Sequence, residues 1–139
     1  MALQLVWFKR DLRCSDHAPL LEAARCGPVL PLYVVEPELW QQPDSSAQQW
    51  AFIAESLLEL RQQLAALGQP LVVRVGAIET VLERAHRQFG VAALWSHQET
   101  GNGWTYARDL RVAAWAHSRG IAWHERPAFG VHRRLAGRS

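Results

Sequence analysis

Short apolar runs alternate along the chain with longer stretches in which apolar residues recur every three or four positions. A short apolar run predicts a buried strand, and the three-four spacing predicts a helix with one apolar face. The pattern therefore predicts strands at residues 3–8, 29–35, 71–75, 91–95 and 121–124. It predicts helices at residues 17–26, 46–67, 78–89 and 104–119, and the apolar stripe is clearest in the second of these.

Local signals mark where the helices begin and end. Asp16 is the expected N-cap of the first helix, and Pro19 falls in its first turn, where a missing N–H costs little. Ser46 followed by Gln49 forms a capping-box pattern ahead of the longest helix. Gly68 is its expected end.

Strands that alternate with helices pair in parallel through right-handed crossovers. We expect one α/β domain over residues 1–139, built on a five-stranded, doubly wound, Rossmann-like sheet in the order 3-2-1-4-5 with helices on both faces. Ligands of such sheets bind at the carboxyl ends of the strands, where the strand order reverses. The loops after the first and fourth strands, residues 8–11 and 96–103, are therefore the expected borders of a site.

The composition is that of a globular protein, since 49% of the 139 residues are hydrophobic and 20% are charged. A formal net charge of +2 gives no argument for nucleic-acid binding. Cys14 and Cys26 lack a CxxC spacing and predict neither a disulfide framework nor a zinc site. The first apolar run is too short for a signal peptide or a membrane span, so we expect a soluble, cytoplasmic protein. The basic end of the chain is interpreted as a solvated tail that contains Arg126, Arg133, Arg134 and Arg138.

Few short patterns predict chemistry on their own. The Gly-Asn-Gly at residues 101–103 lacks a dinucleotide fingerprint, and we interpret it as a turn into the next helix. There is no P-loop pattern, and Ser96 lacks the nucleophile elbow of a hydrolase. We expect no metal site, because the histidines share no ligand spacing: His17, His86, His97, His117, His124 and His132.

The densest group of charges follows the first strand. Lys9, Arg10 and Arg13 lie among Asp11 and Asp16. Such side chains can form an ion-pair lattice that fixes a loop, or they can hold an anionic ligand. The residues alone leave both interpretations open.

This segment also carries a family resemblance. Residues 7–13, Trp-Phe-Lys-Arg-Asp-Leu-Arg, with Asp16 after them, resemble the N-terminal signature of the photolyase/cryptochrome family. Residues 29–37 resemble its second strand, with Glu36 where the family usually has Asp, and Arg108-Asp109 resembles a motif of its fourth helix. The resemblance covers essentially the whole chain. It departs from the family at His17, where the family usually has Asn.

The resemblance implies an N-terminal α/β domain that is followed, in a full-length deoxyribodipyrimidine photolyase, by a helical domain. That domain would hold FAD and damaged DNA, and reduced, light-excited flavin would split cyclobutane pyrimidine dimers. We therefore expect the reading frame to continue past Ser139 and the present chain alone to be non-catalytic. A cryptochrome photoreceptor is the alternative. An alternative of another class is a free-standing Rossmann-like nucleotide-binding protein.

The resemblance also implies a second, antenna chromophore bound by this domain. We expect it at the carboxyl edge of the sheet, bounded by Phe8, Lys9, Arg10, Val35, Glu36 and Glu99. Folate-binding relatives place an Asn-Glu pair where this chain has Trp104 and Thr105, so we expect a flavin-like antenna or none instead of folate. Leu39 and Trp40, in an expected loop, are predicted to meet the helical domain, and the isolated chain is expected to self-associate through such apolar surface.

Overall fold

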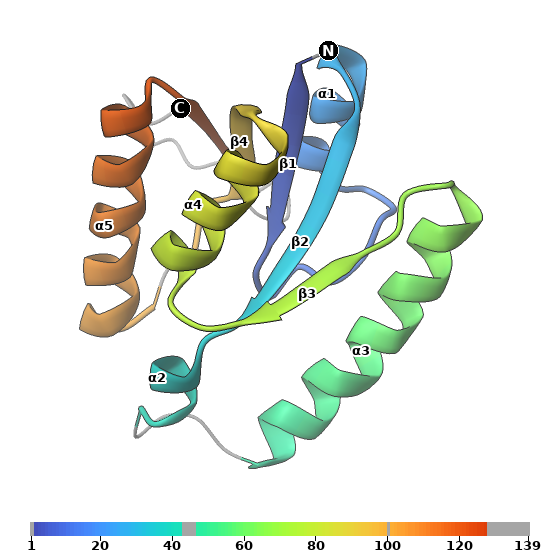
Figure 1. The fold of residues 1–139 in the computed structure, drawn as a ribbon. Coiled ribbons are helices and arrows are strands. Elements are labelled where there is room, and N and C mark those ends of the chain that lie inside the picture. Colours follow the sequence, from blue (N-terminus) through green and yellow to red (C-terminus); the bar gives the residue numbers. More distant parts are fainter. Residues whose placement is uncertain (1, 43–46, 100, 128–139) are drawn as a thin grey trace.

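A computed structural model describes residues 2–42, 47–99 and 101–127. These residues form one parallel sheet of five strands in the order β3-β2-β1-β4-β5, with helices on both faces (Figure 1). This confirms the predicted fold class and strand order. The strands are β1 (Leu3–Phe8), β2 (Val29–Val35), β3 (Val72–Val75), β4 (Val91–His97) and β5 (Ala122–Arg126). The helices are α1 (Ala18–Cys26), α2 (Pro37–Trp40), α3 (Ala47–Ala66), α4 (Ile78–Phe89) and α5 (Gly103–Arg119).

The central strand β1 supplies side chains to both faces of the sheet. Leu5 and Trp7 belong to the core that packs under α4 and α5. Val6 and Phe8 belong to the core that packs under α1 and α3. Successive residues of a strand point to opposite faces, so a strand buried on both sides is apolar throughout. The chain passes from the carboxyl end of β2 directly into α2, which lies below the sheet in Figure 1.

The start of α1 differs from the prediction. Asp16 is not the N-cap, because its backbone adopts a left-handed conformation with φ of 52°. His17 takes this position, and its Nδ1 accepts a hydrogen bond from the Leu20 amide at 3.1 Å. Pro19 does lie in the first turn. The prediction was wrong by one residue because an imidazole acceptor replaces the usual carboxylate or hydroxyl.

The end of β4 was also placed wrongly. The strand continues through Ser96 and His97, which were expected in a loop, because they pair with Glu125 and Arg126 of β5. Arg126 is therefore a strand residue and not part of a solvated tail. Its guanidinium forms an ion pair with Glu22 of α1 at 2.8 Å. Arg133, Arg134 and Arg138 lie outside the described residues.

The segment after β2 is helical where a loop was expected. Pro37 opens α2, because its fixed φ suits the first helical position, and the helix carries Leu39 and Trp40. The predicted capping residue Ser46 lies outside the described residues, and α3 begins at Ala47. Within the predicted apolar stripe of α3, Leu60 and Leu64 are completely buried.

None of the helices in the described segments is both long and apolar enough to cross a bilayer.

Candidate functional site

A cleft of about 570 Å³ opens at the carboxyl edge of the sheet. That volume lies in the range of small-molecule sites. The ends of β1 and β2, the short helix α2, the first half of α3, the segment after β4 and one residue of α5 form its walls. Its lining consists of Phe8, Lys9, Arg10, Tyr33, Val34, Glu36, Leu39, Trp40, Gln49, Phe52, Ile53, Glu99 and Arg108.

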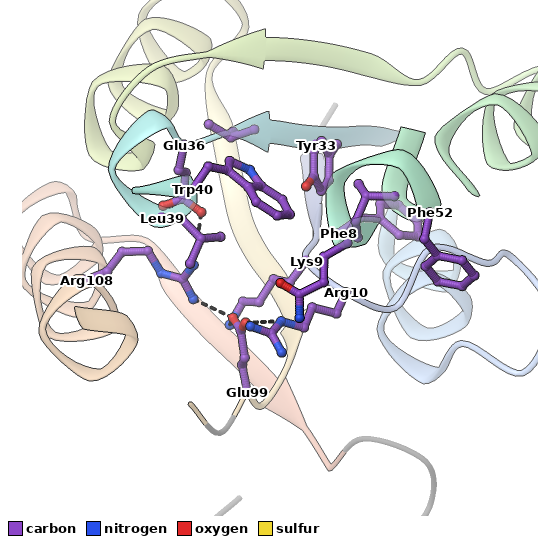
Figure 2. A pocket seen from close by; sticks show the side chains of 13 residues that line it. Phe8, Lys9, Arg10, Tyr33, Glu36, Leu39, Trp40, Phe52, Glu99 and Arg108 are labelled. Carbon is purple, nitrogen blue, oxygen red and sulfur yellow. Dashed lines mark hydrogen bonds and ion pairs between the residues drawn. The ribbon is translucent and has the colours of Figure 1, made fainter. Parts of the chain in front are cut away.

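One wall of the cleft is aromatic and aliphatic. Phe8 and Tyr33 come from neighbouring strands, Trp40 comes from α2, and Phe52 comes from α3 (Figure 2). Trp40 is fixed by an edge-to-face contact with Trp50, with 5.4 Å between ring centroids. Burial raises the pKa of the Tyr33 phenol to about 12, so this group is a neutral hydroxyl near pH 7. The wall can therefore cover the face of a flat, uncharged ring.

The opposite wall is organised by one guanidinium. Arg108 is 1% exposed, and it donates from Nη1 to Glu36 at 2.9 Å. Its Nη2 donates to Glu99 at 2.5 Å and to Asp109 at 2.9 Å. Burial opposes the charge of Arg108, but the three carboxylates outweigh burial and raise its pKa. The side chain is therefore a permanent cation that joins α5, the end of β2 and the segment after β4.

Glu36 has a raised pKa, which is unusual for a carboxyl group in contact with a cation. It is buried, and burial raises its pKa to about 7 although Arg108 acts in the opposite direction. The Glu99 carboxylate nearby raises this pKa further. Near neutral pH the group can therefore accept or donate a hydrogen bond toward a ligand.

Lys9 is the second buried cation of this wall. Its ammonium lies 3.9 Å from Glu99 and 4.0 Å from Asp109, and 4.3 Å from the centroid of the Trp7 ring. Among the described residues, Nζ has no hydrogen-bond partner. Burial lowers the pKa of Lys9. Arg10, in contrast, is largely exposed and approaches Glu99 to 3.4 Å at the mouth of the cleft.

The structure brings together most of the residues that the sequence predicted for this site. Phe8, Lys9, Arg10, Glu36 and Glu99 all line the cleft. Val35 does not line it: it packs against the core under α1 and α3, and its neighbour Val34 lines the cleft instead. Lys9 and Arg10, in the loop after β1, form ion pairs with Glu99 and Asp109, which lie outside that loop.

Sequence reasoning missed Arg108 as a site residue. The signal was present, because Thr105, Arg108, Val112 and Ala116 form the buried stripe of α5. A charged residue on such a stripe requires buried partners. Tyr33 and Phe52 were also missed, and no pattern in the sequence distinguishes them from ordinary core or surface residues.

A second cluster of polar side chains lies next to the cleft, where Asp11, His17 and His97 meet. Asp11 Oδ2 lies 2.6 Å from His17 Nε2 and 2.6 Å from His97 Nδ1, and all three residues are buried. The histidine analysis missed this cluster, because its members are brought together by the fold and not by spacing.

The short separations within this cluster are those of hydrogen bonds. Tetrahedral zinc ligands with bonds of about 2.0 Å lie roughly 3.3 Å apart, which is wider than the 2.6 Å separations found here. In addition, His17 Nδ1 accepts from the Leu20 amide. Neutral His17 therefore carries its proton on Nε2, the atom that a metal would need without one.

Comparison with known proteins agrees with this fold. A model of the DNA photolyase family matches residues 4–132. Blue-light photoreceptor PHR2 of Arabidopsis thaliana is 36% identical over 104 residues, which are 70% of this chain and 23% of that protein. A deoxyribodipyrimidine photo-lyase of Salmonella typhimurium is 40% identical over 102 residues, which are 68% of this chain and 21% of that protein. The chain thus spans less than a quarter of these relatives.

Solved structures give the same result. An archaeal photolyase from Sulfolobus tokodaii, whose crystal structure contains two FAD molecules, superposes with a TM-score of 0.80 and 28% identity. The superposition covers 90% of this chain and 29% of that one. Because the family model matches nearly the whole chain and a solved photolyase shares its fold, this chain belongs to the DNA photolyase family and corresponds to the N-terminal α/β domain of its members.

Proposed function

We propose that this domain binds a flavin-like antenna chromophore in the cleft and serves a full-length deoxyribodipyrimidine photolyase. The observation that carries the proposal is the pairing of an aromatic wall with a wall of buried charges in one cavity. A flat isoalloxazine or deazaflavin ring fits between such walls, because aromatic faces cover the ring while Arg108, Lys9 and Glu36 meet its polar edge. The archaeal photolyase that contains two FAD molecules supports a flavin over other ligands.

Folate is the antenna that we expect not to bind in the usual manner. Trp104 Nε1 donates to Glu38 at 3.3 Å, and Thr105 is buried with its hydroxyl 3.3 Å from the side-chain oxygen of Asn102. Neither residue offers a carboxylate to the paired donors of a pterin. Trp104 is engaged with Glu38 of α2 and Thr105 with Asn102 at the start of α5, which supports a flavin or deazaflavin instead.

The chemical step belongs, in this proposal, to the full-length protein. A following helical domain would hold FAD and the damaged DNA, and it would pack over the half-buried Leu39 and Trp40 at the mouth of the cleft. The apolar Phe52, which is 68% exposed on the same side, supports this docking direction. The similarity to blue-light photoreceptor PHR2 supports a cryptochrome as the second candidate.

The binding proposal is tested by titrating the purified chain with FMN or a deazaflavin while ring fluorescence is followed. Arg10→Ala and Glu36→Ala should each weaken binding at least about tenfold, because each removes a charged or hydrogen-bonding group from the cleft. Arg84→Ala is the matched control, since Arg84 is exposed on α4 and does not line the cleft. Equal affinity in all three variants would reject the site.

The full-length activity needs a separate assay. Blue-light repair of dimer-containing DNA by the full-length protein supports the photolyase. Light-dependent flavin reduction without repair supports the cryptochrome. The 139-residue chain alone should neither retain the catalytic FAD of the helical domain nor repair dimers.

A further inference from the structure

Two buried donor groups of the cleft have no acceptor among the described residues. They are the Lys9 ammonium, directly after β1, and the Trp40 indole N–H, on α2. Both residues line the cleft. A buried donor without an acceptor costs free energy, and most buried polar groups in proteins are hydrogen-bonded. A ligand that completes this cleft is therefore expected to bring acceptor atoms.

The surroundings of Lys9 restrict the kind of acceptor. Its ammonium lies 3.9 Å from Glu99 and 4.0 Å from Asp109, which is too far for hydrogen bonds, and its side chain is only 4% exposed. A phosphate at this place would be repelled by both carboxylates in a buried position that solvent screens little. A neutral carbonyl oxygen would accept a hydrogen bond from Lys9 without that repulsion. The flexible stem of lysine allows the ammonium to turn toward such an oxygen.

Arg10 offers a different kind of group, at the mouth of the cleft. Its side chain is 64% exposed, and its Nε lies 3.4 Å from Glu99. Figure 2 shows Lys9 and Arg10 approaching Glu99 from the side opposite Arg108. An exposed guanidinium keeps donors available and can bind a phosphate through two parallel hydrogen bonds. A phosphate held there would remain in contact with solvent.

We propose that Lys9 and Arg10 determine which way the chromophore enters the cleft. The carbonyl edge of its ring meets Lys9 inside the cleft, and a phosphate on its side chain meets Arg10 at the mouth. Lys9 then selects a ring with a carbonyl edge, and Arg10 selects a phosphorylated ligand. The ligand class is accordingly a flavin or deazaflavin with a phosphorylated side chain, which presupposes the antenna site proposed above.

The orientation is tested by titrating the 139-residue chain with riboflavin and with FMN, which share one ring and differ in the phosphate. Lys9→Met keeps an unbranched side chain and removes the donors, so it should weaken both ligands equally, by about tenfold or more. Arg10→Ala should weaken FMN by about tenfold or more and riboflavin by less than about twofold. Arg84→Ala, on the exposed face of α4, is the control and should leave both affinities unchanged.

The pattern across the two ligands decides between the possible results. If Lys9→Met weakens FMN alone, or if Arg10→Ala weakens both ligands equally, the assignment of ring and phosphate is wrong. Unchanged affinity in Lys9→Met, with flavin bound by the wild type, rejects this orientation and leaves the antenna site standing. If the wild-type chain binds neither ligand, the antenna proposal fails and the orientation fails with it.

The ligand-free chain gives an independent readout of Lys9. Burial lowers the pKa of Lys9 in spite of the two nearby carboxylates, so folding disfavours the charged ammonium. Lys9→Met should therefore have a urea midpoint at pH 7 no lower than that of the wild type. A clearly lower midpoint would show that the ammonium is a structural partner of Glu99 and Asp109, and it would overturn the role of Lys9 in ligand selection.

Discussion

Arg108 of α5 and Glu36 at the end of β2 are 72 residues apart in sequence, yet they share a buried hydrogen bond of 2.9 Å. This contact fixes the distance between the helix on one face of the sheet and the edge at which the cleft opens. Glu99 and Asp109 contact the same guanidinium, so three carboxylates share one cation.

Removing Arg108 should destabilise the fold strongly. Arg108→Leu leaves Glu36, Glu99 and Asp109 without their shared cation, and breaking a buried pair in this way costs about 3–5 kcal/mol. The free energy of unfolding in urea at pH 7 measures the loss. The exposed Arg84→Ala should stay within about 0.5 kcal/mol of wild type. A loss below about 1 kcal/mol for Arg108→Leu would show that the carboxylates find other partners.

Glu36 should make the fold less stable as the pH rises from about 4.5 to 7. Burial raises its pKa from 4.5 to about 7, so in this interval the folded chain binds more protons than the unfolded chain. Stability then falls with rising pH. Compared with Glu36→Gln, the wild type should lose on the order of 2 kcal/mol more between pH 5 and pH 8. Parallel stability profiles for the two proteins would contradict the raised pKa.

Asp11 should have the opposite effect and make the fold more stable as the pH rises. Burial alone would raise its pKa, but the hydrogen bonds from His17 and His97 outweigh burial and hold the pKa well below its usual range. The stabilisation is present above pH 3.8 and is lost as the pH falls below this value. Asp11→Asn should therefore cost on the order of 2 kcal/mol at pH 6 and less at pH 3. A cost that does not change between these pH values would argue against the low pKa.

The packing of α3 offers a matched pair of leucines. Leu60 is completely buried, so Leu60→Ala should cost about 2–5 kcal/mol. Leu58 lies on the same helix with 59% of its surface exposed, and Leu58→Ala should change the unfolding free energy by less than about 0.5 kcal/mol. Chemical denaturation of both variants gives the comparison. Similar losses would mean that the exposed face of α3 is covered in solution, which would support self-association of the isolated chain.

Much of the fold could be predicted because the pattern of apolar residues is local information. β1 and β2 have the predicted bounds, and α4 ends as expected at Gly90, which adopts φ of 73°. The extension of β4 to His97 could not be predicted, because it depends on pairing with β5. The helical character of α2 was hidden because four residues are too few to show a period.

The site was predictable only in part, for a similar reason. The rule that ligands bind at the carboxyl edge located Lys9, Glu36 and Glu99. The rule does not say to which face of the sheet a strand residue points. Whether Val34 or Val35 lines the cleft depends on the alternation of side chains along β2. The Asp11–His97 contact joins residues 86 positions apart, and no spacing rule detects such a pair.

The Lys9 ammonium has one further consequence. It is buried, with no hydrogen-bond partner among the described residues. A ligand oxygen within its reach would accept hydrogen bonds from this ammonium. The ligand would therefore bind the folded form and stabilise it relative to the unfolded chain. At a ligand concentration of 100 times Kd, binding raises the free energy of unfolding by about 2.7 kcal/mol. The melting temperature of the domain should then report how much chromophore it carries, and protein that lacks the chromophore should be the more readily unfolded and degraded fraction.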